Sequence, residues 1–327
     1  MGAVMSSLVR RSFLSIAAAG LIAPAAALGQ TPAEWAAIGQ YGDKAAPVTV
    51  FEKDGALHVD GAGFKSARLT GKGDGRYAIA GGGELVLEKG VIRINGKPLA
   101  FHDFGAEVTA AIHAVVHADP VALRKRALAA TPPVEKGDFL PSDLVDVTTI
   151  DPGVKLDIRY ATDNNFMGIQ LYERPGAYMQ RLAAEALGRA NKALAAQGYG
   201  LLIHDAYRPW FVTWMFWDAT PPEDHVFVAD PSEGSRHNRG CAVDLTLYDL
   251  KTGKAVEMPG RYDELSTRSY ADFVGGTSAQ RARRAILRRA MEAQGFTVYP
   301  EEWWHFDFND WRRYPIGTKT FTELAAR

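Results

Sequence analysis

The sequence predicts an α+β protein made of two parts. Residues 31–105 alternate short β-prone runs with glycine-rich turns, a pattern typical of a small antiparallel β structure. Residues 277–294 form a clear amphipathic helix, and an aromatic, β-prone run follows at residues 303–308. Because strand–helix–strand units are few in the rest of the chain, α+β is favoured over a parallel α/β sheet.

The composition is that of an ordinary globular protein. A chain of 327 residues is long for one domain and comfortable for two, and 47% hydrophobic with 23% charged residues allows normal cores. The formal net charge of −1 gives no general attraction to anionic partners, so we expect no nucleic-acid partner. Cys241 is the single cysteine, which excludes an intrachain disulfide and metal sites built from two or four cysteines.

Residues 1–29 have the pattern of an export signal. Arg10-Arg11 supplies the positive start, residues 13–28 are an apolar, alanine-rich run, and Ala25-Ala26-Ala27 offers a cleavage site. We therefore expect export to the periplasm or cell envelope, with no stable membrane anchor after signal cleavage. The arginine pair also resembles a twin-arginine signal, but Val9 stands where that pattern prefers Ser or Thr, which leaves the route open. An uncleaved anchor is the alternative.

Residues 31–105 are expected to form a small antiparallel β module, either a meander or a partial barrel. Asp54-Gly55 and Asn95-Gly96 lie between alternating runs and are strong hairpin signals. His58 and His102 have no carboxylate or cysteine partner at metal-ligand spacing, so both are interpreted as ordinary strand residues. The module is a candidate for contact with the cell wall, although none of its residues identifies a ligand.

Residues 106–140 are interpreted as a helical connector and a linker. Apolar residues recur at helical spacing to about residue 128, with an interruption at Pro120. Residues 131–138 read Thr-Pro-Pro-Val-Glu-Lys-Gly-Asp, a composition typical of a linker. We therefore place a domain boundary here and a second domain at residues 141–327.

The second domain mixes short strands with helices. The expected elements are strands at residues 144–150, 155–159 and 201–203, a helix from Tyr178 to Leu194, and an aromatic helix at residues 213–217. Thr277 and Gln280 form a capping box at the start of the helix over residues 277–294, and Gly295 ends it.

Two groups of polar residues are weaker site candidates. His113 and His117 would share a helix face, but no third ligand accompanies them, so a structural role is favoured. Arg281, Arg284 and Arg288 on the long helix suggest an anion site, but a solvated helix face is the preferred interpretation.

Two stretches carry potential metal ligands. Residues 235–244 read Ser-Arg-His-Asn-Arg-Gly-Cys-Ala-Val-Asp, with His237 expected on a loop and Asp244 on the strand that follows. His305 lies in the aromatic strand, and Glu302 precedes it. Two histidines and one aspartate would leave a fourth zinc position open for water, with Glu302 beside the metal as a base.

The ordered combination Ser-x-His-x6-Asp followed by Glu-x-x-His resembles the zinc D-alanyl-D-alanine dipeptidases, the type known from vancomycin resistance. Two more segments match in the family's order: Asp205-Ala206-Tyr207-Arg208-Pro209, and Met258-Pro259 with Tyr262-Asp263-Glu264. The resemblance covers roughly residues 143–325. It implies a zinc D,D-peptidase-type domain with a central antiparallel sheet and flanking helices, one zinc ion (Zn2+) per chain, and a small dipeptide as substrate.

The resemblance also implies roles for single residues. His237, Asp244 and His305 would hold the zinc. Glu302 would take a proton from the attacking water and later return it to the leaving nitrogen. Arg208 would stabilise the oxyanion that forms on the substrate carbonyl. The substrate-binding candidates are Ser235, Asp163 and Asn164.

Three further points concern the residues next to His305. Glu301 rivals Glu302 as the base, but the spacing to His305 favours Glu302. Asp307 either orients His305 or ends the strand. Residues three apart on a regular strand face opposite sides, so Glu302 and His305 can converge only if the chain bends near residues 300–303.

Three functions compete on this evidence. The leading hypothesis is hydrolysis of D-alanyl-D-alanine to two D-alanine, in the turnover of cell-wall-derived dipeptide. The alternative is a zinc D,D- or L,D-carboxypeptidase that acts on peptidoglycan stem peptides, because those relatives share the metal ligands. A non-catalytic, metal-stabilised binding module, as in the related hedgehog signalling domain, is the third. The presence of both Glu302 and Arg208 argues against the third.

Overall fold

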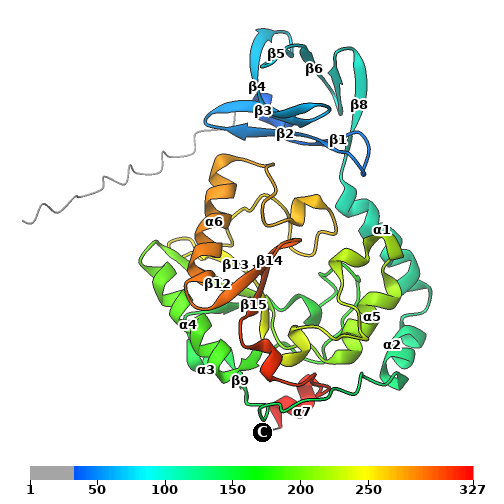
Figure 1. Ribbon diagram of the computed structural model, residues 1–327, viewed down its shortest axis with the longest axis vertical. Helices are drawn as coiled ribbons and strands as arrows, with labels where there is room; N and C mark the ends of the chain where they lie inside the picture. Colours follow the sequence, from blue (N-terminus) through cyan, green and yellow to red (C-terminus); the bar gives the residue numbers. More distant parts are fainter. Residues whose placement is uncertain (1–32, 327) are drawn as a thin grey trace, which may run out of the picture.

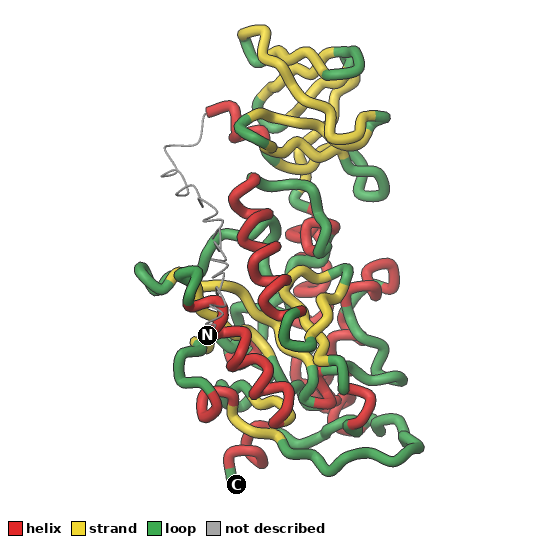
Figure 2. Tube along the Cα trace, turned by 60° about the vertical axis from the view of Figure 1, so that its left-hand side comes forward, coloured by secondary structure: helices red, strands yellow, loops and turns green. Residues whose placement is uncertain are grey.

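The computed structural model describes residues 33–326, which form a β-barrel and a larger body of helices and sheets (Figure 1). The expected export signal at residues 1–29 lies outside the described residues. Within the described part of the chain, no helix has the length and apolar character needed to cross a membrane. Figure 2 shows the barrel at one end of the molecule, and each part has its own apolar core.

Eight antiparallel strands close into the barrel, because β1 pairs with both β2 and β8. The strands are β1 (Gly39–Tyr41), β2 (Val48–Lys53), β3 (Ala56–Gly61), β4 (Phe64–Gly73), β5 (Arg76–Ile79), β6 (Glu84–Glu88), β7 (Val91–Ile94) and β8 (Lys97–His102). Asp54 and Asn95 each have φ of +51° and precede a glycine with positive φ, as two-residue hairpin turns require. Val50, Val59 and Leu85 fill the interior. The module is therefore a closed barrel, whereas a meander or a partial barrel was expected, and closure leaves no exposed sheet edge.

Two helices and an extended linker lead from the barrel to the body. The helices are α1 (Phe104–Ala118) and α2 (Pro120–Ala129). Asp119 separates them and caps α2, since its side chain accepts a hydrogen bond from the main-chain N–H of Ala122 at 2.8 Å. The linker is pinned to the body, because the Glu135 carboxylate accepts hydrogen bonds from Arg239 Nη2 at 2.6 Å and from the Ile316 N–H at 2.7 Å.

Five strands form the main sheet of the body, in the order β10-β12-β13-β15-β14. They are β10 (Lys155–Leu156), β12 (Tyr199–Asp205), β13 (Ala242–Asp249), β14 (Phe296–Tyr299) and β15 (Glu302–Phe308). The central pairs are antiparallel as expected, but the short edge strand β10 runs parallel to β12. The sheet is therefore mixed. Its three central strands carry or border the residues of the site described below.

Helices flank this sheet, as expected. The helices of the body are α3 (Val147–Ile150), α4 (Arg181–Ala195), α5 (Trp210–Ala219), α6 (Ser278–Glu292) and α7 (Phe321–Ala325). A separate two-stranded sheet pairs β9 (Leu144–Asp146) with β11 (Tyr178–Gln180). Helices α4 and α6 pack on the main sheet (Figure 1). The capping box of Thr277 and Gln280 at the start of α6 is confirmed.

Three local expectations need correction. The strand expected at residues 144–150 turns into helix α3, because the Asp146 side chain accepts a hydrogen bond from the Thr148 N–H at 2.9 Å and starts a helical turn. Tyr178 lies on β11, and the helix begins three residues later. Arg284 is buried, and it donates to the carbonyls of Tyr270 and Phe273 instead of lying on a solvated face.

Candidate active site

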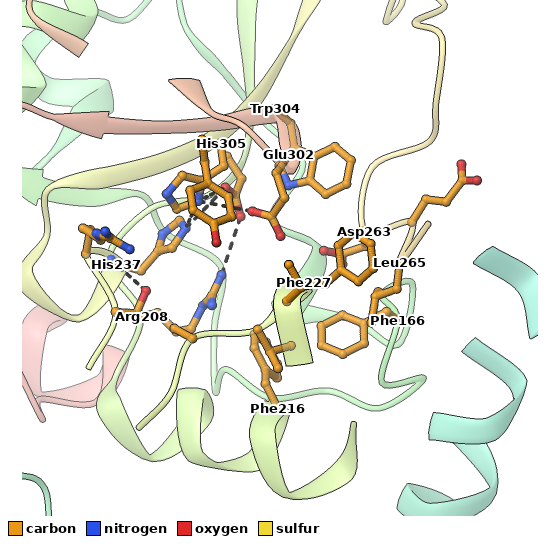
Figure 3. A pocket seen from close by; sticks show the side chains of 18 of the residues that line it. Phe166, Arg208, Phe216, Phe227, His237, Asp263, Leu265, Glu302, Trp304 and His305 are labelled. Carbon is orange, nitrogen blue, oxygen red and sulfur yellow. Dashed lines mark hydrogen bonds and ion pairs between the residues drawn. The ribbon is translucent and has the colours of Figure 1, made fainter. Parts of the chain in front are cut away.

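The three predicted ligands meet at one point beside the main sheet (Figure 3). His237 lies on the short 3-10 helix η4 (His237–Arg239), while Asp244 of β13 and His305 of β15 are paired residues of adjacent strands. His237 Nε2 lies 3.1 Å from His305 Nδ1 and 3.3 Å from Asp244 Oδ1. The distance between His305 Nδ1 and Asp244 Oδ1 is 3.1 Å. All three residues are buried, and no other group of three potential ligands occurs among the described residues.

When both imidazoles are neutral, the hydrogen bonds around them leave the facing nitrogens without protons. His237 Nδ1 donates to the Ala206 carbonyl at 2.6 Å, and His305 Nε2 donates to Asp307 Oδ1 at 2.9 Å. This network assigns the ring protons to the outer nitrogens, so the inner nitrogens face Asp244 Oδ1 with lone pairs, and that oxygen has no hydrogen-bond donor. Lone pairs so close together repel unless a cation lies between them. The donor set therefore fits a metal ion, with Asp307 orienting His305.

The electrostatics of the cluster also favour a cation. Burial alone would lower the pKa of His305, but the carboxylates of Asp307 and Asp244 outweigh burial and raise this pKa to about 10. Burial would raise the pKa of Asp244, yet the two imidazoles hold it well below its usual range. The two carboxylates therefore favour positive charge at this point, which is supplied either by a second ring proton on His305 or by a metal ion that replaces this proton.

Glu302 is the carboxylate next to this cluster. Its Oε2 lies 3.5 Å from His305 Nδ1, and Glu302 lines the same cavity as the ligands, whereas Glu301 does not. Burial, assisted by the negative charge of Asp244, raises the pKa of Glu302 to about 8. The pairing of β14 with β15 shifts register just before the hairpin turn. This irregularity is the bend that lets Glu302 and His305 reach one site.

Arg208 lies in the turn between β12 and α5, and its guanidinium is fixed from several sides. Its Nε and Nη2 each lie 2.9 Å from Asp205 Oδ2, and Nη2 lies 3.5 Å from Asp244 Oδ2. Tyr172 OH donates to the other Asp205 oxygen at 2.7 Å. The guanidinium carbon lies 4.6 Å from the ring centroid of Phe216. The result is a buried cationic donor held beside the ligand cluster (Figure 3).

The ligand cluster opens into a small cavity of about 80 Å³. Apolar side chains of Phe166, Phe216, Phe227, Val228 and Leu265 line part of its wall, as Figure 3 shows for four of them. Polar groups of Arg208, Ser235, Asp263 and Glu302 line the rest. A cavity of this size and mixed character suits a small, partly polar molecule.

Asp263 is a cavity residue to which the sequence analysis assigned no role. Its Oδ1 accepts a hydrogen bond from Tyr160 OH at 2.8 Å, while its buried Oδ2 has no donor. Burial raises the pKa of Asp263 to about 7. It has φ of +58° on an irregular segment, so no helix or strand pattern could place it. Its position in the Tyr-Asp-Glu motif was the only available signal.

Ser235 is the one predicted substrate-binding residue that the structure brings to the cavity. It is buried in the cavity wall, and its Oγ accepts a hydrogen bond from the His237 N–H at 3.2 Å. The hydroxyl therefore also helps to shape the loop that carries the first ligand.

Asp163 and Asn164 do not reach this cavity. Both are exposed, and neither lines the space beside the ligands. They turn outward because Asn165 Nδ2 donates to two main-chain carbonyls of the same loop, at 2.7 and 2.9 Å, which closes a tight turn. Phe166, on the same loop, lines the cavity instead.

Three other residues that could bind a metal, Cys241, His113 and His117, have contacts typical of a structural role. Cys241 is buried, and burial raises the pKa of its thiol far above the ordinary range, so it does not present a thiolate. His113 and His117 stack with ring centroids 5.1 Å apart, and His117 Nε2 lies 3.2 Å from the Gly168 carbonyl oxygen. They belong to no group of three ligands among the described residues.

Comparison with known proteins gives one consistent result. A family model described as D-ala-D-ala dipeptidase (Peptidase M15) matches residues 141–323. The D-alanyl-D-alanine dipeptidase of Escherichia coli (strain K12) is 33% identical over 181 residues, which cover 55% of this chain and 92% of that protein. Those of Enterococcus faecium and Enterococcus faecalis are 39% and 36% identical, each over 48% of this chain and 87% of their own length.

Solved structures add little. A structure of the LdcB LD-carboxypeptidase is 20% identical and covers 56% of this chain and 72% of that one, with a TM-score of 0.31 that is too low for a comparison of folds. The family match at residues 141–323 contains every residue of the cavity named above, and it contains neither the barrel nor α1.

Proposed function

The chain belongs to the D-Ala-D-Ala dipeptidase family of metallopeptidases, and we propose that it hydrolyses D-alanyl-D-alanine to two molecules of D-alanine. The observation that carries this proposal is the convergence of His237, Asp244 and His305, with Glu302 only 3.5 Å from the His305 ring. Two imidazoles and one carboxylate are a donor set typical of catalytic zinc, which leaves one position for the reacting molecules. Zinc bound there would supply Lewis acidity that polarises the scissile carbonyl and acidifies the attacking water.

Glu302 acts as the proton carrier. It accepts a proton from the attacking water and passes it to the leaving nitrogen of the peptide bond. Burial raises the pKa of Glu302 and so favours its role as a proton carrier, because a group that titrates near the working pH is both an adequate base and an adequate acid. Glu301 is adjacent in sequence but does not line the cavity, so it lies in the wrong place to carry this proton.

Arg208 donates hydrogen bonds to the substrate carbonyl oxygen as negative charge develops on it. Asp205 fixes the guanidinium before the substrate arrives, so the donor needs no rearrangement during the reaction. Removal of one such donor typically costs about 10²–10³ in kcat.

The cavity supports a free dipeptide as substrate. The unpaired Oδ2 of Asp263 suits the ammonium group of a dipeptide, and Ser235 adds a polar contact. The two methyl side chains would lie against the apolar wall that includes Phe166 and Leu265. A stem peptide carries an uncharged acyl group where the dipeptide carries its ammonium, so Asp263 favours the dipeptide over the carboxypeptidase alternative.

We propose further that residues 1–29 direct export and that the enzyme degrades dipeptide derived from the cell wall in the periplasm or cell envelope. The signal pattern supports export, and the extent of the family match supports a peptidase domain near residues 141–327. Residues 31–105 and 106–140 would then be a module and its connector. Cell fractionation of the full chain tests the location.

Metal analysis combined with a substrate comparison tests the function. Purified protein should hold one zinc ion per chain and should hydrolyse D-Ala-D-Ala, with little action on L-Ala-L-Ala or on N-acetyl-D-Ala-D-Ala. The N-acetyl substrate is the matched control for the ammonium group. Release of D-alanine from a stem pentapeptide at a higher kcat/KM than from the dipeptide would favour the carboxypeptidase. Absence of zinc together with absence of hydrolysis would overturn the proposal.

A further inference from the structure

The segment between β13 and α6 forms part of the active-site wall but contains little regular structure. Residues 258–277 include a single 3-10 turn, η5 (Thr267–Ser269). Tyr262 OH donates to Asp244 Oδ2 at 3.3 Å, and Asp263 and Leu265 line the cavity. A segment this long without helices or strands needs contacts from elsewhere to hold one conformation.

Glu264 organises the middle of this segment. It is buried, and its carboxylate accepts hydrogen bonds from the Arg261 N–H and from Ser266 Oγ, both at 2.9 Å. Arg268 Nε lies 3.2 Å from the same carboxylate. Because Glu264 follows Asp263 directly, its position sets the position of the carboxylate that faces the substrate.

The first turn of α1 packs directly on Glu264. A Cβ atom added at Gly105 would lie 2.4 Å from Glu264 Cγ and 3.1 Å from its Cδ, distances that no side chain could occupy without displacing one of the two. Asp103, the residue that caps α1, pairs with both Nη atoms of Arg261, at 2.8 and 3.0 Å. The absence of a side chain at residue 105 is therefore what allows the helix to seat here.

The barrel contacts the two later parts of the same segment. Gln40 Nε2 of β1 donates to Thr267 Oγ1 at 2.9 Å. The Glu52 N–H of β2 donates to the Gly276 carbonyl at 3.1 Å, and the Glu52 carboxylate accepts the Ser278 N–H at 2.6 Å. That carboxylate lies at the N-terminus of α6, where negative charge is stabilising, and Glu52 is only 4% exposed.

These contacts come from a part of the chain that lies outside the family match. The barrel and α1 precede residue 141, where the family match begins, and the alignment with the Escherichia coli relative, over 181 residues, covers 92% of that protein. The catalytic residues lie on the sheet and on the turn after β12, and the barrel does not bond to them. The extension therefore contacts the substrate wall directly, and it reaches the metal ligands only through the hydrogen bond from Tyr262 to Asp244.

We propose that the barrel and the first turn of α1 form a clamp that positions the substrate-binding segment 258–277, with Gly105 and Glu52 as positioning residues. The proposal rests on the dipeptidase function proposed above. Loss of the clamp should weaken substrate binding more than it slows the chemical steps, because Asp263 and Leu265 move while His237, Asp244 and Glu302 stay in place.

Steady-state kinetics of two variants and their controls test the clamp. Gly105→Ala and Glu52→Ala should each raise KM for D-Ala-D-Ala roughly tenfold, with kcat close to wild type and zinc content unchanged. Glu52→Gln keeps one oxygen acceptor for the Ser278 N–H and should restore most of the affinity. Glu88→Ala removes an exposed barrel carboxylate that pairs with Arg93 and should leave KM unaltered.

Hydrogen exchange supplies a readout that does not depend on activity. Amides of residues 258–277 should exchange faster in Gly105→Ala and Glu52→Ala than in Glu88→Ala, and the sheet strands should not change. Ala111→Gly, on the exposed side of α1, controls for helix propensity. Unaltered exchange in both test variants, or faster exchange with an unaltered KM, would overturn the clamp. If the wild-type protein does not hydrolyse the dipeptide but the variants show the expected differences in exchange, only the proposed function is overturned.

Discussion

The barrel and the active site differ in where they keep their charged groups. The barrel interior holds apolar side chains such as Leu85 and Ile92, and its ion pairs lie at the surface. The active site buries ionic side chains such as Arg208, Asp244 and His305. Burial of apolar groups stabilises the barrel directly, whereas each buried charge of the site persists only because an opposite charge or a metal ion compensates for its lost hydration. Within one chain, the apolar interior of the barrel supplies stability, and the buried charges of the active site serve function.

Two of the buried polar residues in the barrel bond to the other part of the molecule. Gln40 and Glu52 are buried polar residues of the barrel, and both bond to the body of the molecule. At these two positions buried polar side chains mark the contact between the barrel and the body.

The largest expected effect comes from removal of a ligand. His305→Ala should abolish zinc binding and hydrolysis, because it deletes one of three donors and leaves Asp307 without its partner. Metal analysis of the purified variant measures the first effect. His117→Ala, which alters an exposed histidine outside the cluster, should keep its zinc. Full zinc content in His305→Ala would show that another residue supplies the third ligand.

A smaller loss is expected when the proton carrier is removed and the metal stays. Glu302→Ala should lower kcat by about 10²–10⁴ while zinc remains bound, because proton transfer is lost but the ligands are intact. The adjacent Glu301→Ala is the matched control and should retain nearly full activity, since Glu301 does not line the cavity. Hydrolysis is measured for both variants at equal zinc content. A large loss in Glu301→Ala with nearly full activity in Glu302→Ala would show that Glu301 is the proton carrier.

A change in the barrel core should affect stability and leave the metal centre alone. Ile92 is fully buried, so Ile92→Ala should cost about 2–5 kcal/mol of unfolding free energy, from the lost burial of apolar atoms together with the cavity left behind. Denaturant unfolding followed by circular dichroism measures this. Val121→Ala, at a position on α2 that is 77% exposed, should cost little. Loss of zinc from folded Ile92→Ala protein would contradict the separation of the two parts.

The smallest effect is expected from a partly exposed ion pair. The hydrogen bond from His204, with help from Arg159 and against burial, lowers the pKa of Asp157 from 3.8 to about 2. A pKa that is lower in the folded state stabilises above the unfolded value, so this contribution is present above about pH 4 and is lost as pH falls through about 2. The Asp157 side chain is 44% exposed, so Asp157→Asn should cost less than about 1 kcal/mol at pH 7. The difference from wild type, measured by urea unfolding, should shrink at pH 2, and a difference that grows there would contradict the assignment.

The local structure of the barrel could be predicted from its turns, but its closure could not. Asp54-Gly55 and Asn95-Gly96 specify hairpins because both residues of each turn need positive φ. The pairing of β1 with β8 joins strands far apart in sequence, and no local pattern encodes it. In the same way, the cap at Asp146 turned an expected strand into α3, because a side-chain hydrogen bond outweighed β propensity.

The active site likewise contains residues that the sequence predicts and residues that it does not. His237, Asp244 and His305 were predicted because their residue types and order are distinctive, and the structure brings them together. Asp163 and Asn164 were predicted because their loop resembles the family's substrate-side segment, and the hydrogen bonds of the next residue turn them outward. Asp263 was not assigned a role, because its place depends on contacts made by distant parts of the chain and not on periodicity.

Closure of the barrel through β1 also sets a limit on how the N-terminus can be trimmed. β1 is only three residues long, yet it supplies the hydrogen-bonding partners of both β2 and β8. A recombinant protein that starts beyond Tyr41 would keep the hairpins from β2 to β8 and the whole catalytic half, but β2 and β8 would both lose the strand they pair with. Unpaired strands of this kind recruit other chains, so such a truncation should turn a soluble preparation into one prone to aggregate.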